Sequence, residues 1–390
     1  MPNDLILSRR AFLIGCSIAA SPLLTPVTFA AATGENRLVV IVLRGAMDGL
    51  DVVRPLGDPA YNALRPTLAA DAAKSLDLDG FFALHPAAAA LMPLWQVGEL
   101  GFAHAVATPY RLGRSHFIGQ DALENGAGAA DGAMTASHDG WLNRALSQIK
   151  GATAETGVSV GQQRLLILDG AQKVDHWYPV SESPLSTQGQ QLLAAVNAAD
   201  PLFAEPYAQA QALAHLTEGE IVPRNGIAYR QLGQYVAERL LGPSRIASFS
   251  LGGWDTHHAQ AKTMAEQLSA LSDVILAMKA GLGVEWGRTI VLAMTEFGRT
   301  ARENGTGGTD HGTGGMAVMA GGALKGKRVM GEWPGLGEGQ LLSDRALMPT
   351  ADVRAYAGWA LRGLFGLEAT ALQNVVFPGL DLGSDPGLLL

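Results

Sequence analysis

Five short, mostly apolar runs, each ended by glycine or by a polar side chain, constrain the fold of this chain more than any other feature. The first, 38–43, contains only Leu, Val and Ile and is followed by Arg44 and Gly45. The other runs span 165–168, 245–251, 289–295 and 316–320. An uninterrupted β-branched run is typical of a strand buried on both faces, as in parallel sheets. We therefore predict a strand at each run.

Helical periodicity lies between these runs. The candidate helices span 86–97, 190–198, 226–241 and 258–279, and the last is clearly amphipathic. Strands that alternate with helices predict an α/β fold with a large, mostly parallel or mixed sheet between helical layers. A chain of 390 residues with 16% charged side chains can bury a large core. We expect one domain over 33–390, with 185–243 as a helical side layer or cap.

The first 32 residues resemble a twin-arginine export signal. Arg9 and Arg10 precede a short apolar stretch, 11–24, and small residues follow it, which is the pattern of a removable secretory peptide. A membrane anchor is less favoured, because 11–24 is shorter than the roughly 20 apolar residues of a spanning helix and contains Pro22. We expect the twin-arginine translocase as a partner, a periplasmic or secreted location, and no stable membrane span in the mature chain.

Composition argues against several classes of function. The only cysteine, Cys16, lies in the export signal, so the mature chain should form no disulfide and offer no thiolate as a nucleophile or zinc ligand. Lipidation of Cys16 is a less favoured alternative, because this residue lies so close to the arginine pair. The formal net charge is −8 and no basic run occurs, which argues against a nucleic-acid partner. No phosphate-binding glycine signature follows the first run, which disfavours a nucleotide-dependent oxidoreductase.

Polar side chains that follow the predicted strands mark the expected site, because ligands of such sheets bind beyond the carboxyl ends of the strands. These residues are Arg44, Asp48, Asp255, His257, His258, Glu296 and Arg299. Asp310 and His311 add a second carboxylate–imidazole pair in a glycine-rich loop. Neutral imidazole with carboxylate is a ligand set for zinc, manganese or iron, and without thiolates it suits an open catalytic site.

Each of these residues also has an ordinary structural interpretation. Asp255 could cap the helix that follows it, since Asp before a helix accepts backbone N–H bonds. One of His257 and His258 is expected on the solvent face of that helix. Asp310 could be an ordinary turn residue.

Several motifs together carry a resemblance to a known family. They are 43–50 (LRGAMDGL), 114–117 (RSHF), 252–257 (GGWDTH), 295–300 (TEFGRT) and 308–312 (GTDHG). They resemble the bacterial family DUF1501, over nearly the whole mature chain down to 376–379. The resemblance implies a twin-arginine signal and a fold related to the alkaline phosphatase and sulfatase superfamily. It also implies one or two metal ions at strand ends and a hydroxyl nucleophile that attacks phosphate or sulfate esters.

The resemblance also implies which residues hold metal. Asp48 resembles the metal-binding Asp after the first strand of that superfamily. The ligands of one later metal site in that superfamily are matched here by Asp255, by His257 or His258, and by His311. In the other site the carboxylate survives as Glu296, but Phe297 stands where a histidine is expected. We therefore expect one retained site for a divalent ion such as zinc, manganese or calcium.

Candidate catalytic residues surround this site. Ser115 is the candidate nucleophile at the start of a probable helix, with His116 as base or anion contact; the alternative is that Ser115 only caps that helix. Arg44, Arg114 or Arg299 could supply a second positive charge to a small-molecule or glycan ester. The sequence thus predicts an exported metal-dependent hydrolase of phosphate or sulfate esters. The alternative is a non-catalytic periplasmic binding or assembly protein on a degenerate form of the same fold.

Overall fold

The computed structural model describes residues 35–111, 113–128, 138–161, 165–177 and 226–390. The export signal predicted over 1–32 and the helix predicted over 190–198 lie outside the described residues. Most of the side layer or cap expected over 185–243 lies outside them as well. Its last part, 226–241, is the helix α9 (Gly226–Leu241), with the predicted bounds.

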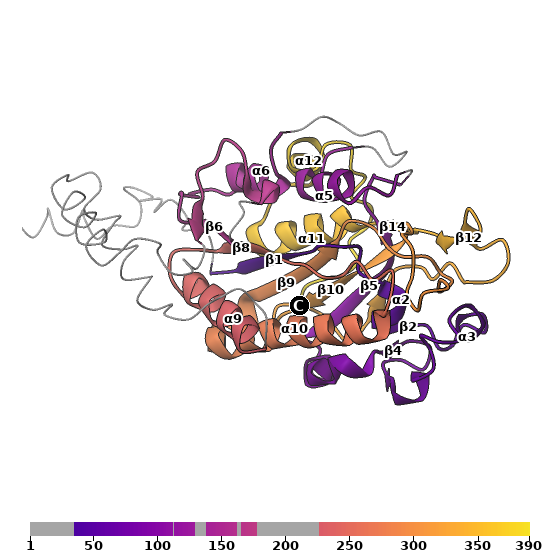
Figure 1. The fold of residues 1–390 in the computed structure, drawn as a ribbon. Coiled ribbons are helices and arrows are strands. Elements are labelled where there is room, and N and C mark those ends of the chain that lie inside the picture. The colour runs from indigo at the N-terminus through magenta and orange to yellow at the C-terminus, as the bar shows by residue number, and fades with distance from the viewer. Residues whose placement is uncertain (1–34, 112, 129–137, 162–164, 178–225) are drawn as a thin grey trace, which may run out of the picture.

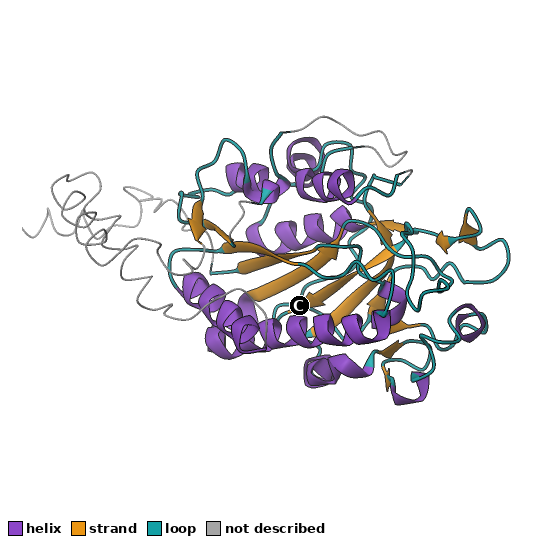
Figure 2. Ribbon diagram, in the orientation of Figure 1, coloured by secondary structure: helices purple, strands orange, loops and turns teal. Residues whose placement is uncertain are grey.

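A nine-stranded mixed sheet forms the centre of the molecule (Figures 1 and 2). Its order is β11-β5-β10-β9-β1-β8-β6-β7, and β14 pairs with β5. The strands are β1 (Arg37–Leu43), β5 (Leu100–Ala107), β6 (Gly157–Val160), β7 (Asp175–Trp177), β8 (Ile246–Leu251), β9 (Thr289–Thr295), β10 (Gly315–Ala320), β11 (Val329–Met330) and β14 (Ala351–Asp352). β1 runs parallel to β8 and β9, whereas β10 runs antiparallel to β9 and β5. The predicted α/β class is confirmed.

Four of the five predicted strands are confirmed, as β1, β8, β9 and β10. The prediction for 165–168 is wrong: Leu166–Leu168 is a short 3-10 helix, η3. Ile167 and Leu168 are fully buried and belong to the same apolar cluster as Trp141 and Leu142 of α6. A four-residue apolar run cannot be distinguished from a buried helical turn by periodicity alone.

Helical layers cover both faces of the sheet (Figures 1 and 2). On one face lie α10 (Gln260–Leu282), α9, η2 (Pro86–Leu91) and α4 (Met92–Gln96), so the predicted helix 86–97 forms as a 3-10 helix followed by an α-helix. On the other face lie α11 (Val353–Phe365), α6 (Trp141–Gln148) and α5 (His116–Asn125). The remaining elements are α2 (Gly49–Val52), β2 (Val53–Arg54), α3 (Tyr61–Leu64), η1 (Ala72–Lys74), β3 (Leu76–Asp77), β4 (Ala83–Leu84), η4 (Gly283–Arg288), β12 (Leu341–Leu342), β13 (Ala346–Leu347), α12 (Ala369–Ala371) and η5 (Leu372–Val376).

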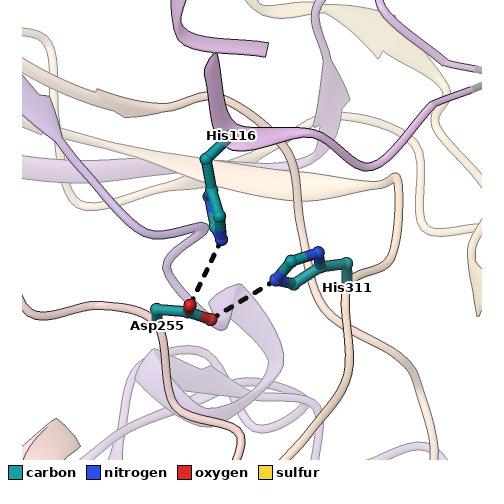
Figure 3. Close-up of side chains that lie close together, drawn as sticks. All are labelled: His116, Asp255 and His311. Carbon is teal, nitrogen blue, oxygen red and sulfur yellow. Dashed lines mark hydrogen bonds and ion pairs between the residues drawn. The ribbon is translucent and has the colours of Figure 1, made fainter. Parts of the chain in front are cut away.

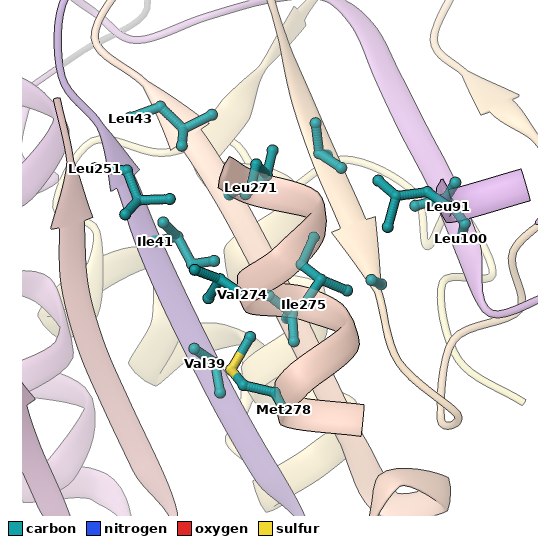
Figure 4. Close-up of a cluster of buried hydrophobic side chains, with 14 of the residues drawn as sticks. Val39, Ile41, Leu43, Leu91, Leu100, Leu251, Leu271, Val274, Ile275 and Met278 are labelled. Carbon is teal, nitrogen blue, oxygen red and sulfur yellow. The ribbon is translucent and has the colours of Figure 1, made fainter. Parts of the chain in front are cut away.

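The alternation of side chains along β1 divides the core between these two layers. Val39, Ile41 and Leu43 pack in one apolar cluster with α10 (Figure 4), whereas the intervening residues pack in a second cluster with α11. All seven residues of β1 are buried, as expected for a strand with a helical layer on each face. The stretch Gln260–Arg288 is long and apolar enough to cross a membrane, but its helix α10 lies in the core of this fold.

The strand directions bring four loops to one edge of the sheet, since the loop that follows β9 is the one that precedes β10. β1, β8 and β9 are parallel, and β5 runs the same way because both β5 and β9 are antiparallel to β10. The loops that follow these four strands therefore meet. Gly45 allows the closest approach: its φ is +118°, and a Cβ there would lie 2.5 Å from the backbone nitrogen of Asp255.

Candidate metal centre

His116, Asp255 and His311 converge at this edge from three separate segments (Figure 3). His116 is the first residue of α5, Asp255 follows β8, and His311 precedes β10. One ligand atom from each lies within 4.8 Å of the others. The Nε2 atom of His116 is 3.3 Å from Asp255 Oδ2, and Nε2 of His311 is 3.4 Å from Asp255 Oδ1. These three residues form a group that could hold a metal ion.

His257 adds a third imidazole to this group. Its Nε2 lies 3.2 Å from Asp255 Oδ1 and 2.9 Å from Nε2 of His311. Four ligands about 2.1 Å from a tetrahedral zinc ion lie about 3.4 Å from one another. The distances from the three Nε2 atoms to Asp255 oxygens, 3.2 to 3.4 Å, are close to that value.

Each of the three imidazoles has an oxygen partner at its other nitrogen. Nδ1 of His116 is 2.7 Å from Glu296 Oε1, and Nδ1 of His311 is 3.0 Å from the backbone oxygen of Arg114. Nδ1 of His257 is 3.3 Å from Asp310 Oδ1. An Nδ1–H that donates to oxygen leaves the lone pair on Nε2, which faces Asp255 in all three rings. Metal-ligating histidines almost always have such a partner.

The orphaned nitrogen of His116 also fits a metal ligand. Its Nε2 is buried and has no hydrogen-bond partner. Its hydrogen bond to Glu296, which outweighs the opposing effect of burial, raises the pKa of His116. Burial, together with the charge of Arg299, lowers the pKa of His311 and favours its neutral, ligating form. Protons would therefore compete with an ion more strongly at His116 than at His311.

Arg299 fixes Asp255 in place. Its side chain is fully buried, and Nη2 donates to Asp255 Oδ1 at 2.6 Å. Burial raises the pKa of Asp255, but the hydrogen bond and charge of Arg299 outweigh it and hold that pKa below its usual value. Nε of Arg299 donates to the oxygen of Ala46 and Nη1 to that of Thr309. All three nitrogens are thus used within the protein. Arg299 was predicted as a positive charge that faces the substrate, whereas here it holds Asp255 in position.

Glu296 and Phe297 lie behind the imidazoles. Glu296 is fully buried and accepts from His116, from the backbone nitrogen of Gly45 at 2.9 Å and from Gln120 at 3.2 Å. Burial raises its pKa, but these bonds, that of His116 foremost, lower it overall. Phe297 stacks on His116 with ring centroids 5.1 Å apart. Glu296 was predicted as a metal ligand, whereas the structure places it as the hydrogen-bond partner of His116, a candidate ligand.

Two further predicted ligands lie apart from the cluster. Asp48 is 1% exposed and forms a two-pronged ion pair with Arg65 at 2.7 and 3.1 Å. The charge of Arg65 therefore satisfies this carboxylate where the superfamily resemblance implied a metal ion. His258 is exposed and, among the residues that the structure describes, makes no contact with the cluster. It is the histidine of the pair that faces solvent.

The remaining candidate catalytic residues line the rim. Arg44, with 31% of its side chain exposed, pairs with Glu124 at 2.6 Å and also donates to Gln120. Burial raises the pKa of Glu124 despite the opposing charge of Arg44. The side chain of Arg114 is exposed. Ser115 occupies the N-cap of α5 without a side-chain capping bond, so its hydroxyl is not used to close the helix.

Gln260 carries a role that the sequence did not predict. It is fully buried, and its oxygen accepts from Thr256 at 2.9 Å and Thr309 at 2.7 Å, while its nitrogen donates to Asp48 at 2.6 Å. Thr256 adjoins Asp255 and His257, and Thr309 adjoins Asp310, so Gln260 ties together the two loops that carry the ligands. A lone glutamine in an amphipathic helix gives no sequence signal for this role.

Fold and site together define an α/β protein with a candidate metal centre at the edge of a mixed sheet. The chain belongs to the family described as "Protein of unknown function (DUF1501)", whose profile matches residues 105–375. The predicted family is confirmed, although the matched region reaches neither the motif at 43–50 nor the segment 376–379. A search of curated proteins found no match.

Similar solved structures include a periplasmic domain, a lipoteichoic acid synthase and a member of the alkaline phosphatase superfamily. The C-terminal periplasmic domain of EcEptC from Escherichia coli, in complex with Zn, has a TM-score of 0.41 at 9% identity, covering 92% of this chain and 93% of that one. The lipoteichoic acid synthase LtaP from Listeria monocytogenes has a TM-score of 0.39 at 9% identity, covering 91% and 77%. A protein in the alkaline phosphatase superfamily from Vibrio parahaemolyticus has a TM-score of 0.34 at 12% identity, covering 75% and 62%. Similarity at this level carries no argument about activity. We therefore infer the chemistry from the residues of the site.

Proposed function

We propose that this protein is a hydrolase of phosphate or sulfate esters that uses a single divalent ion, with zinc favoured over manganese and calcium. One observation carries the proposal: the imidazoles direct Nε2 at one carboxylate while Nδ1 of each meets an oxygen. Nitrogen-rich ligand sets suit zinc and manganese, whereas calcium prefers oxygen ligands. A second ion is not expected, because Arg65 neutralises Asp48 and Phe297 offers no ligand atom.

In this proposal His116, Asp255 and His311 hold the ion and leave one coordination position open. A bound ion would polarise an ester oxygen and stabilise the charge that develops on it. His257 Nε2, oriented through Asp310, is placed to accept a proton from the attacking group. The hydroxyl of Ser115 is the candidate nucleophile, adjacent in sequence to His116.

Arg44 is the proposed second positive charge. Its guanidinium is partly exposed, and Glu124 and Gln120 hold it at the rim. Gln120 also donates to Glu296, the partner of His116, at 3.2 Å. Arg44 is therefore linked to the metal ligands through a short chain of hydrogen bonds. Its planar group can pair with two oxygens of a phosphate or sulfate.

The test combines metal content with turnover. We expect the purified chain to contain about one equivalent of zinc and to hydrolyse aryl phosphate or aryl sulfate esters. Asp255→Ala and His311→Ala should lose both the metal and the activity, and Ser115→Ala should lose activity while keeping the metal. His258→Ala is the matched control, because this exposed histidine lies near the cluster but outside it. A chain that binds no metal and shows no turnover, with Asp255→Ala equal to wild type, would falsify the proposal.

One observation favours a second candidate function, a binding or assembly protein with a structural ion. If His257 is a fourth ligand, as its 2.9 Å separation from Nε2 of His311 permits, the ion has no open position. The two functions differ in the behaviour of His257→Ala. If the protein is a hydrolase with an open site, His257→Ala should keep its zinc and lose turnover. If the ion is structural and His257 is its fourth ligand, His257→Ala should lose both zinc and stability.

Export by the twin-arginine route is part of the proposal and depends on Arg9 and Arg10 alone. A cell-fractionation experiment with wild type and the Arg9→Lys, Arg10→Lys double variant tests it. We expect wild type in the periplasmic fraction and the variant in the cytoplasm. Equal distribution of the two proteins would argue against this route.

A further inference from the structure

A cavity of about 400 Å³ lies beside the metal centre. The loop that follows β9 and the β12–β13 hairpin, which projects from the sheet in Figure 1, form its walls. Its charged lining residues are Arg302, Glu303, Asp310, Asp344 and Arg345. The cavity adjoins the metal centre at Asp310, which lines the cavity and also contacts His257.

Asp310 forms the boundary between the two sites. Its Oδ1 lies 3.3 Å from Nδ1 of His257, on the side of the metal centre. Its Oδ2 lies 3.5 Å from Nη2 of Arg345, on the side of the cavity. Any group in the cavity would therefore lie two side chains away from Nε2 of His257. At that distance from His257, the cavity suits a second group of the substrate better than it suits the ester that reacts.

The hydrogen bonds in the cavity leave arginine N–H donors available. Both oxygens of Glu303 accept from the backbone nitrogen of Thr67, and one accepts from that of Leu68 at 2.8 Å. Asp310 is used by Asn304 and His257. Two carboxylates of the lining are thus already satisfied by the protein.

The arginines are less fully satisfied. Arg302 is exposed and forms no ion pair within the described ranges of the chain. Arg345 has 39% of its side chain exposed, and its guanidinium group makes one ion pair with the described part of the chain, the long 3.5 Å contact to Asp310. Asp344 is the one acidic lining residue with no described side-chain partner. The two guanidinium groups therefore keep unused donors, whereas Glu303 and Asp310 already accept hydrogen bonds from the protein, and unused arginine donors suit an oxyanion ligand.

We propose that this cavity is a subsite for a second oxyanion group of the substrate, and that Arg302 and Arg345 bind it. The inference rests on the proposed function and narrows its substrate class. The preferred substrates carry a phosphate, sulfate or carboxylate beyond the ester that is hydrolysed. A sugar that bears two such esters has this chemistry.

The experiment compares two matched probes, glucose 1-phosphate and glucose 1,6-bisphosphate. Their binding to the full chain is measured by calorimetry with zinc present, on proteins that all carry Ser115→Ala so that the bound esters are not hydrolysed; wild type in this comparison means the chain with that one change. We expect the bisphosphate to bind wild type more tightly. Arg302→Ala and Arg345→Ala should each weaken bisphosphate binding about tenfold, the effect of one charge-assisted hydrogen bond, and leave monophosphate binding unchanged. Asp344→Asn, which removes the unpaired negative charge, should strengthen bisphosphate binding.

The arms of this experiment separate the two proposals. If Asp255→Ala binds both sugars like wild type, the metal proposal fails, and a selective effect of Arg302→Ala still supports an oxyanion site in the cavity. If Asp255→Ala loses binding while both arginine variants match wild type, only the subsite proposal fails. Equal affinity of wild type for the two sugars, or equal losses for both sugars in the arginine variants, also overturns the subsite. Arg302 is exposed, so its replacement does not endanger the fold.

Discussion

Replacement of Glu296 by glutamine tests whether the carboxylate behind His116 tunes the metal centre. Glu296 Oε1 accepts from His116 Nδ1 at 2.7 Å, from Gly45 at 2.9 Å and from Gln120 at 3.2 Å. Glutamine has the same shape and keeps an oxygen at this position. Its amide nitrogen would face the hydroxyl of Thr295, which now donates to Glu296 Oε2 at 3.0 Å and can donate to the oxygen of Leu43 instead. The substitution therefore removes charge and little else.

The expected loss follows from the role of such partners. Removal of the group that hydrogen-bonds a ligating histidine typically costs about 10- to 100-fold in metal affinity, or roughly 1.4 to 2.7 kcal/mol. Glu296→Gln should thus bind zinc about 10- to 100-fold more weakly than wild type. Most of the secondary structure should remain, because the hydrogen bonds of the backbone are preserved.

Competition with a coloured zinc chelator measures this affinity, and thermal unfolding of the zinc-free chain reports on folding. Glu285→Gln is the matched control. Glu285 accepts from the buried Arg37 at 2.6 Å, and Arg37 begins β1, so the pair lies at the opposite edge of the sheet. The reasoning is refuted if Glu296→Gln and Glu285→Gln both bind zinc like wild type while Asp255→Ala does not.

Three further predictions concern the framework of the site. His104 is 2% exposed, and burial lowers its pKa from 6.5 to about 4. Between these pH values the unfolded chain binds a proton at His104 more readily than the folded chain does. The free energy of unfolding therefore falls as the pH drops from 6.5 towards 4. The stability advantage of wild type over His104→Gln, measured by urea unfolding at several pH values, should shrink by about 3 kcal/mol across this window; a constant difference would contradict the assignment. Gly45→Ala should lower stability and zinc affinity together, because its Cβ would lie 2.5 Å from the nitrogen of Asp255; retention of wild-type affinity would show that this close approach is not needed. Gln260→Met should cost more free energy of zinc binding than free energy of unfolding of the zinc-free chain, because it frees the loops at Thr256 and Thr309. A loss of stability without a loss of zinc affinity would limit Gln260 to a structural role.

Local sequence patterns were sufficient to predict the central strands and two long helices. The run 289–295 becomes β9 with the predicted bounds, and 226–241 becomes α9 in the same way. Strands with a helical layer on each face are apolar on both sides, so their signal is continuous along the chain. The prediction for 165–168 was wrong because its apolar residues cover a helix, and burial alone does not specify backbone conformation.

Polar residues after apolar strands and the family resemblance together indicated the residues of the candidate site. Asp255, His311 and either His257 or His258 were expected together, and the geometry brings Asp255, His257 and His311 within hydrogen-bond distance of one another. His116 was expected as a base or anion contact, and its place among the candidate metal ligands was not. That place depends on β5, which no apolar run predicted, and on the direction of this strand in the sheet.

The sequence by itself determined the class of fold, the family and the kinds of side chain available for chemistry, because these follow from local pattern and motif. Only the tertiary structure decided which carboxylate an arginine neutralises away from the candidate metal centre and which one an arginine holds within it. Arg65 neutralises Asp48 and Arg299 holds Asp255, and each pair joins segments that are separate in the chain. Long-range pairing of this kind depends on how the sheet brings loops together, and no local pattern encodes it.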